Sequence, residues 1–297
     1  MKKLLLTILI ILLIIVISCK SINNIKNPII TNNEKYFETS VFPVKGIIIV
    51  AHGLNTNPLK MGDEHTNGTL VKLFLDEGYN VYRVILSGHE GAIEEMQSIN
   101  AQDWIDSALI QYREVAEIAY KNNIPIYLTA FSLGGLVFEN LIHYKEDVNF
   151  TGTILFAPAI AIKGTARAGI FISDIFLADN AIIKSKAPVE YRAQKGVSIS
   201  AYNALFELED NLYKNEFENC NIPTLVFIDP NDELINVSKL QKSITNFNLS
   251  NWNVATISNT GTEIKPKYHH LIIDCKCVSS ETWNVICERI KYFLEAY

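Results

Sequence analysis

A serine between a strongly apolar segment and a helical pattern constrains the fold of this chain most. The apolar segment Pro125–Ala130 predicts a buried strand, and the residues from Leu136 onward predict a helix. Between them, Ser132 has small residues two positions before and after it, Ala130 and Gly134. Such a turn lifts the serine hydroxyl above the sheet only if its flanking residues are small, because larger side chains would collide with the neighbouring strand and helix. The pattern is typical of a nucleophile elbow, although it also occurs in ordinary glycine-rich turns.

The rest of the chain alternates apolar strands with amphipathic helices. Further strands are predicted at residues 45–51, 80–85, 151–156, 224–228 and 253–257, and helices at residues 68–77, 101–121, 237–246 and 281–297. Several of these strands are too apolar to have one face in water. We therefore expect an α/β fold with a mostly parallel sheet that is covered by helices on both faces.

One long segment, residues 159–217, interrupts this alternation. It contains no clean strand pattern, but it has apolar patches and a helical run near its end. An insertion at this place follows a predicted strand and would lie over the carboxyl ends of the strands, where ligands bind in such sheets. We therefore predict a helical cap.

The N-terminus has the pattern of a secretory signal. Two lysines precede an apolar run, Leu4–Ile17, and Ser18 and Cys19 follow it. The run is shorter than the roughly 20 apolar residues that span a membrane. The residues up to Cys19 resemble a bacterial lipobox, which predicts a signal peptide over residues 1–18, a lipid on Cys19, a tether over residues 19–40 and one domain over residues 41–297. The domain would be membrane-anchored in the bacterial cell envelope, outside the cytoplasm; an uncleaved anchor helix is the alternative.

Charge and cysteine content limit the partners. The 297 residues have a formal net charge of −6, and no basic cluster follows the N-terminal lysines, so nucleic acid is not an expected partner. The cysteines after Cys19 could form two disulfides or remain thiols: Cys220, Cys275, Cys277 and Cys287. A zinc site from Cys275 and Cys277 with a nearby histidine lacks a second well-spaced pair. We expect neither a metal nor an organic cofactor.

A nucleophilic serine needs a base, and the base needs an orienting acid. Asp229 and Asp232 both follow the predicted strand 224–228. We favour Asp232, because a loop residue a few places beyond the strand can reach across to a histidine. The base is expected in the loop before the last helix, where His269 and His270 are adjacent.

An oxyanion hole would need two backbone N–H groups near the serine. One is expected from Leu133, at the start of the helix, and the other from Leu54, in the loop after the first central strand. Gly53 would let that loop approach the substrate closely. We interpret His52, directly before it, as a structural residue rather than a second base.

These motifs together resemble the α/β-hydrolase superfamily, and most of all its bacterial carboxylesterases and monoacylglycerol lipases. The resemblance rests on His52-Gly53, Gly88-His89, Asp103-Trp104, the Ser132 elbow, the paired aspartates and the final histidine, in this order. In those enzymes an apolar run ending in aspartate follows the catalytic histidine, and Leu271–Asp274 gives this match when His269 is the base. The resemblance implies a Ser132–His269–Asp232 triad and the α/β-hydrolase fold.

The expected activity is therefore hydrolysis of carboxylic esters, including lipid-derived esters, through an acyl-enzyme. The same triad could also cleave thioesters, amides or peptide bonds, because the fold hosts all of these reactions. A non-catalytic lipoprotein that uses the fold as a binding module is the alternative of another class.

Overall fold

A seven-stranded sheet forms the centre of the molecule. The computed structural model describes residues 35–297 except 91, 179, 259–262 and 265–266, so the expected signal peptide, Cys19 and most of the expected tether lie outside the described residues. The strand order is β1-β3-β2-β4-β5-β8-β9, and every neighbouring pair is parallel except β1 with β3. The strands are β1 (Tyr36–Phe37), β2 (Gly46–Ala51), β3 (Tyr79–Val84), β4 (Ile126–Phe131), β5 (Gly152–Phe156), β8 (Thr224–Ile228) and β9 (Trp252–Thr256).

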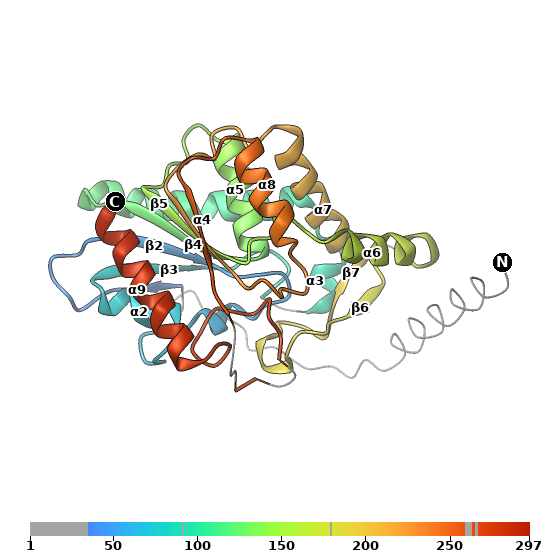
Figure 1. Cartoon of the computed structure of the whole chain (residues 1–297), viewed down its shortest axis with the longest axis horizontal. Coiled ribbons are helices and arrows are strands. Elements are labelled where there is room, and N and C mark those ends of the chain that lie inside the picture. Colours follow the sequence, from blue (N-terminus) through green and yellow to red (C-terminus); the bar gives the residue numbers. More distant parts are fainter. Residues whose placement is uncertain (1–34, 91, 179, 259–262, 265–266) are drawn as a thin grey trace.

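Helices cover both faces of the sheet (Figure 1). α2 (Leu70–Asp76) and α9 (Ser280–Ala296) lie on one side, and α4 (Ala101–Asn122), α5 (Leu133–Tyr144) and α8 (Val237–Asn246) lie on the other. Two short elements, η2 (Pro58–Met61) and α3 (Ile93–Gln97), follow β2 and β3. The central strands β2, β3 and β5 are buried along their whole length and are therefore largely apolar on both faces, with Asn80 and Arg83 of β3 as buried polar exceptions.

The predicted α/β class is confirmed, and the predicted strands begin within one residue of the observed ones. One strand differs from the prediction. Residues 36–37, which fall in the expected tether, form β1 and pair antiparallel with Tyr82 and Val81 of β3. A two-residue strand is too short to give a sequence pattern. Tertiary contacts hold it on β3, among them the bond from Asn80 Nδ2 to the Tyr36 hydroxyl at 2.9 Å.

The inserted segment, residues 159–217, contains two helices and a small hairpin. Its elements are α6 (Gly164–Phe176), β6 (Ile182–Lys184), η3 (Val189–Tyr191), β7 (Gly196–Ser198) and α7 (Ile199–Lys214). β6 and β7 form a separate antiparallel sheet, whereas the sequence predicted no clean strand here. Both strands have only three residues, which explains why their pattern is weak.

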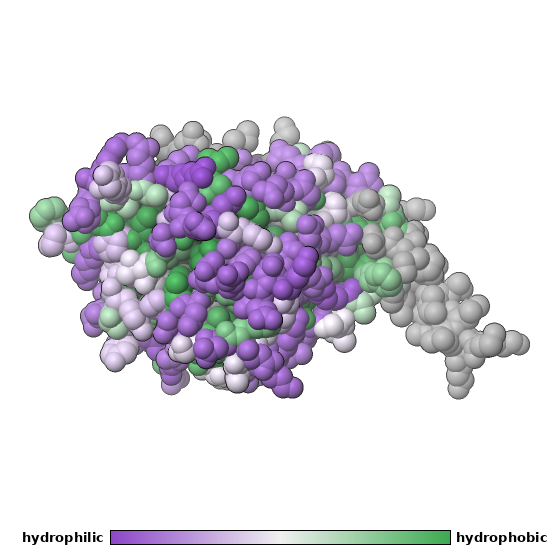
Figure 2. Space-filling view, turned by 90° about the horizontal axis from the view of Figure 1, so that it is seen from above, coloured by the Kyte–Doolittle hydropathy of each residue, from purple (hydrophilic) through white to green (hydrophobic). Residues whose placement is uncertain are grey.

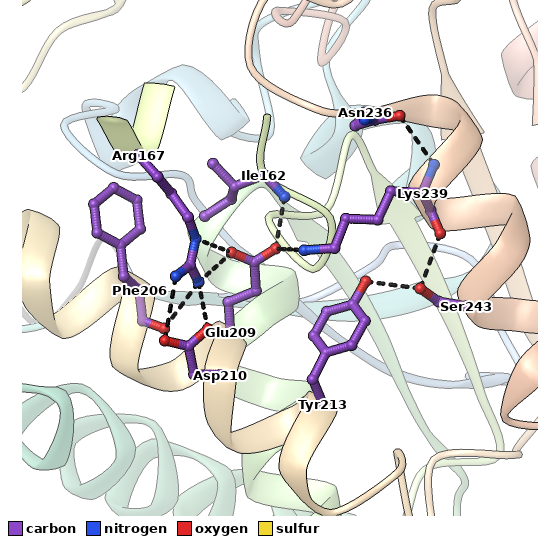
Figure 3. A network of polar contacts seen from close by, with 9 residues as sticks. All are labelled: Ile162, Arg167, Phe206, Glu209, Asp210, Tyr213, Asn236, Lys239 and Ser243. Carbon is purple, nitrogen blue, oxygen red and sulfur yellow. Dashed lines mark hydrogen bonds and ion pairs between the residues drawn. The ribbon is translucent and has the colours of Figure 1, made fainter. Parts of the chain in front are cut away.

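A buried carboxylate fixes the two helices of this segment to the rest of the domain (Figure 3). Glu209 of α7 is fully buried and accepts hydrogen bonds from Arg167 of α6 and from Lys239 of α8. The N–H of Ile162 donates to the same carboxylate at 2.7 Å. Because donors from α6, from α8 and from the loop before α6 converge on one group, α6 and α8 are held together through α7.

The surface is mixed in character. Figure 2 shows a largely hydrophilic face with smaller hydrophobic areas between the polar side chains. Among the described residues, no helix is both long and apolar enough to cross a membrane.

Candidate active site

Ser132 lies on a sharp turn between β4 and α5. Its backbone has φ 49° and ψ −112°, a conformation that non-glycine residues rarely adopt. The surrounding structure holds this strained turn, since the N–H of Ser132 donates to Phe156 and its carbonyl accepts from Ala159 and Leu136. The serine is 8% exposed, so its hydroxyl lies just beneath the surface.

The small residues around Ser132 allow three segments to approach one another. A Cβ added to Gly134 would lie 2.8 Å from the carbonyl oxygen of His52, and one added to Gly53 would lie 2.7 Å from the Phe131 ring and 3.1 Å from the Cβ of Ser132. Ala130 is fully buried within β4, where its single methyl group is accommodated. The steric argument from the sequence therefore holds at Gly134, and Ala130 is a tolerated departure.

His270, and not His269, lies beside the serine. The Nε2 atom of His270 is 2.9 Å from the Oγ atom of Ser132, and its Nδ1 atom is 2.8 Å from the Oδ2 atom of Asp232. The prediction chose His269 over His270 as the partner of Ser132, and this choice is wrong. Consecutive side chains of the loop point in different directions, and the imidazole of His270 turns inward against the Phe131 ring, at 5.1 Å between centroids.

His269 forms a second histidine–carboxylate pair. Its Nδ1 atom is 2.9 Å from the Oδ2 atom of Asp229, and its side chain is 23% exposed. Glu233 joins the two pairs, because its carboxylate accepts from the backbone N–H groups of both His269 and His270, at 3.0 and 2.9 Å. Glu233 was not predicted as a site residue. In the sequence, only its position directly after Asp232 could have pointed to this role.

Asp232 remains ionised although it is buried. Burial raises its pKa, but the charge of His270 and hydrogen bonds from His270, Ile235 and Leu234 outweigh this effect and lower the pKa below the usual value. The N–H groups of Leu234 and Ile235 donate to its Oδ1 atom at 2.7 and 2.8 Å, which leaves Oδ2 for the imidazole. A carboxylate held in this way can orient the histidine and stabilise its protonated form.

The two predicted oxyanion donors lie at loop and helix ends next to the serine. Leu133 is the first residue of α5, and Leu54 follows Gly53, which packs on Ser132. Neither N–H group has a hydrogen-bond partner within the described part of the chain. An unpaired N–H group at a helix start can bind an anion, as that of Leu133 could, and the unpaired N–H of Leu54 in the neighbouring loop could also donate to a developing negative charge.

Two further buried histidines shape the loops around the serine. His52 accepts from the N–H of Leu86 through Nε2, so its Nδ1–H donates to the carbonyl of Gly53. Burial and the neighbouring His89 lower the pKa of His52 far below the usual value, and burial lowers the pKa of His89 to about 4. Both imidazoles are therefore neutral at pH 7 and act as hydrogen-bonding links, as the sequence interpretation of His52 proposed.

Two surface cavities lie away from the serine. One of about 330 Å³ lies between α6 and α7, and one of about 610 Å³ lies between the start of α6 and α8. Among the described residues, no group of three His, Cys, Asp or Glu side chains is arranged to hold a metal ion. No disulfide joins the described cysteines.

One protein family matches most of the described chain. Residues 43–264 match the family described as "Serine aminopeptidase, S33". Among curated proteins, none has a matching sequence.

Solved structures share the fold at low sequence identity. One of the metagenome-derived lipolytic enzymes LipS and LipT is 16% identical with a TM-score of 0.66, over 90% of this chain and 99% of that one. A monoglyceride lipase from Saccharomyces cerevisiae is 12% identical with a TM-score of 0.66, over 88% and 90% of the two chains. A monoacylglycerol lipase from Paleococcus ferrophilus is 16% identical with a TM-score of 0.61, over 88% and 98%.

Proposed function

The chain belongs to the serine aminopeptidase S33 family of α/β-hydrolases, and on this premise we propose that it cleaves carboxylic esters with Ser132 as the nucleophile. In this proposal His270 is the general base and Asp232 orients it. The observation that carries the proposal is the chain of contacts from Ser132 Oγ to His270 Nε2, at 2.9 Å, and from His270 Nδ1 to Asp232 Oδ2, at 2.8 Å. Both distances are within the range that proton transfer between a nucleophile and its base requires.

The reaction would proceed through an acyl-enzyme. The hydroxyl proton of Ser132 moves to His270 Nε2 while Oγ attacks the acyl carbon, and the carbonyl oxygen becomes an oxyanion near the N–H groups of Leu54 and Leu133. His270 then gives the proton to the leaving alcohol. A water molecule loses its proton to His270 and attacks the acyl carbon; when the bond to Oγ breaks and the acid leaves, His270 returns that proton to Ser132 Oγ.

The substrate class is inferred from the structural neighbours. They are described as lipolytic enzymes and as monoglyceride or monoacylglycerol lipases, which favours small esters of fatty acids. A second candidate is cleavage of an N-terminal amino acid from a peptide, which the family description favours. The same nucleophile, base and oxyanion donors would act on either carbonyl.

A comparison of ester and amide substrates tests both candidates. The full chain in detergent would be assayed with p-nitrophenyl esters of increasing acyl length, with monoacylglycerol and with aminoacyl p-nitroanilides, beside a Ser132→Ala variant. Ester turnover that vanishes in the variant supports the esterase, and the preferred acyl length shows how long an acyl chain the site accepts. Turnover of the anilides alone supports the peptidase. If no substrate turns over and a fluorophosphonate does not label Ser132, the proposed hydrolase activity is wrong.

We also propose that Cys19 carries the lipid that anchors the chain in the bacterial envelope. This rests on the residues around Cys19, which resemble a lipobox after a short apolar run. A cysteine with several acyl chains would hold the domain firmly at the membrane, whereas one chain would bind weakly. Incorporation of a labelled fatty acid that is lost in Cys19→Ser would support this anchor, and incorporation unchanged in the variant would contradict it.

A further inference from the structure

The inserted segment is hydrogen-bonded to the loop that supplies one predicted oxyanion donor. Residues 191–194, here called the strap, run beside residues 55–57 of the loop 53–57, here called the oxyanion loop. Thr56 and Arg192 form an antiparallel bridge, and the N–H of Asn57 donates to the carbonyl of Tyr191 at 2.8 Å. The strap is more than a hundred residues away in the sequence, so this pairing exists only in the folded domain.

Asn55 is the centre of this pairing. Its side-chain Oδ1 accepts from the N–H of Gln194 at 2.7 Å, and its Nδ2 donates to the carbonyl of Gln194 at 3.0 Å. Its own carbonyl accepts from the N–H of Ala193 at 2.9 Å. Both polar atoms of the side-chain amide therefore bond the backbone of the strap, as a neighbouring strand would. The residue is buried, with 4% of its surface exposed.

The backbone of Asn55 is fixed from the other side as well. Its N–H donates to Nε2 of His89 at 3.0 Å, and Nδ1 of His89 lies 3.2 Å from the carbonyl of Leu86 and 3.1 Å from that of Ser87. Asn55 has a φ of 54°, in the left-handed region where an asparagine is tolerated better than most residues. Two independent sets of bonds thus hold a locally unfavourable backbone.

Leu54 lies between this anchored residue and Gly53, which packs on Ser132. The other donor, the N–H of Leu133, is oriented by α5 itself. No helix or strand contains Leu54, which is half-buried in a turn. Its N–H shares a peptide plane with the carbonyl of Gly53, which accepts from His52 Nδ1 at 2.9 Å and from the N–H of Thr56 at 3.1 Å. The direction of the Leu54 N–H is therefore set by His52 and by the turn through Asn55 that brings Thr56 to Gly53.

From these contacts we propose that Asn55 is a positioning residue for hydrolysis: by bonding the backbone of Gln194 it holds the Leu54 N–H at the oxyanion position, so that the inserted segment completes the oxyanion hole. This inference rests on the proposed function of Ser132. The hydrogen bonds of Asn55 go to Gln194, Ala193 and His89 and not to Asp232 or His270. Its replacement should therefore change the orientation of the oxyanion donor without changing proton transfer.

The test replaces Asn55 by glycine in the full chain. Asn55→Gly keeps the left-handed backbone without strain and removes only the side-chain bonds to Gln194. Asn123→Gly is the matched control, because Asn123 has a φ of 50° at the exposed C-terminal end of α4. Each variant is measured for kcat and KM on a p-nitrophenyl ester, for the pH dependence of kcat, and for the inhibition constant of a trifluoromethyl ketone, which forms an oxyanion on the serine.

We expect Asn55→Gly to lower kcat by about 10- to 100-fold. This is less than the loss of about 10²- to 10³-fold that follows removal of a complete oxyanion donor, because the Leu54 N–H remains present. KM should stay within about 3-fold, and the midpoints of the pH profile should not move, since His270 and Asp232 are untouched. The inhibition constant should rise by the same factor by which kcat falls. Asn123→Gly should match the wild type in all three measurements.

Wild-type kcat and inhibition in Asn55→Gly, or an equal loss in Asn123→Gly, would overturn the inference while the hydrolase remains established. Absence of turnover and of Ser132 labelling in the wild type would overturn the proposed function and this inference together. If Asn55→Gly does not fold, Asn55→Asp keeps the acceptor for the Gln194 N–H and removes the donor. A loss of kcat with unchanged KM is again expected, and unchanged kcat refutes the role of Asn55.

Discussion

Glu139 is a buried acid whose protonation should make stability depend on pH. It lies in the middle of α5, fully buried, and no nitrogen or oxygen of the described structure bonds its carboxylate; the thiol of Cys220 lies beside it and partly offsets the effect of burial on its pKa. Burial raises its pKa from the usual 4.5 to about 8. An isolated carboxylate is costly in an apolar interior, so the folded protein keeps this group protonated at pH 7.

The sign of the effect follows from proton binding. Between pH 4.5 and pH 8 the folded chain holds a proton on Glu139 that the unfolded chain has released. Stability therefore falls as the pH rises through this window, and it levels off above the folded pKa. Each pH unit corresponds to about 1.4 kcal/mol, so the loss relative to pH 4.5 is roughly 3 kcal/mol at pH 7.

Replacement of Glu139 by glutamine removes the ionisable group and keeps its size. The difference in unfolding free energy between Glu139→Gln and the wild type should then grow in favour of the variant by roughly 3 kcal/mol between pH 4.5 and pH 7. Any constant effect of the amide on packing cancels in this comparison. Urea unfolding at half-unit pH steps measures it, with the exposed Glu146→Gln as control. A difference for Glu139→Gln that does not vary with pH would refute the reasoning.

Three further predictions concern the catalytic contacts and the inserted segment. His270→Ala should lower kcat by about 10⁴-fold or more and abolish fluorophosphonate labelling, whereas His269→Ala should keep kcat within about 10-fold. A larger loss in His269→Ala than in His270→Ala would show that His269 is the base. Asp232→Asn should lower kcat by roughly 10³- to 10⁴-fold in steady-state kinetics with little change in KM, because an amide cannot stabilise the imidazolium; a change confined to KM would contradict this. Glu209→Gln should lower the urea-unfolding free energy by roughly 3 kcal/mol, since two cations lose a buried partner, while the exposed Asp210→Asn should lower it by less than about 1 kcal/mol. Equal effects at the two positions would argue against the buried network.

The position of the nucleophile was predictable because its determinants are local. The apolar strand, the small residues Ala130 and Gly134 and the helix that follows all lie within a short stretch around Ser132. The acid was predictable to the correct loop for a similar reason, since carboxyl ends of parallel strands meet at one edge of the sheet. The structure brings Asp232 to the imidazole beside the serine and pairs Asp229 with the other histidine.

The sequence by itself therefore determined the fold class, the serine turn and the loops from which its partners come, because these follow from periodicity and from residue size within single segments. Only the tertiary structure decided which of two adjacent histidines faces the serine, because the direction of a loop side chain depends on what surrounds it, here the Phe131 ring and the carboxylate of Asp232. The same holds for the bonds between Asn55 and Gln194, since two loops 139 residues apart leave no joint pattern in the sequence and meet only when the inserted segment folds over the sheet.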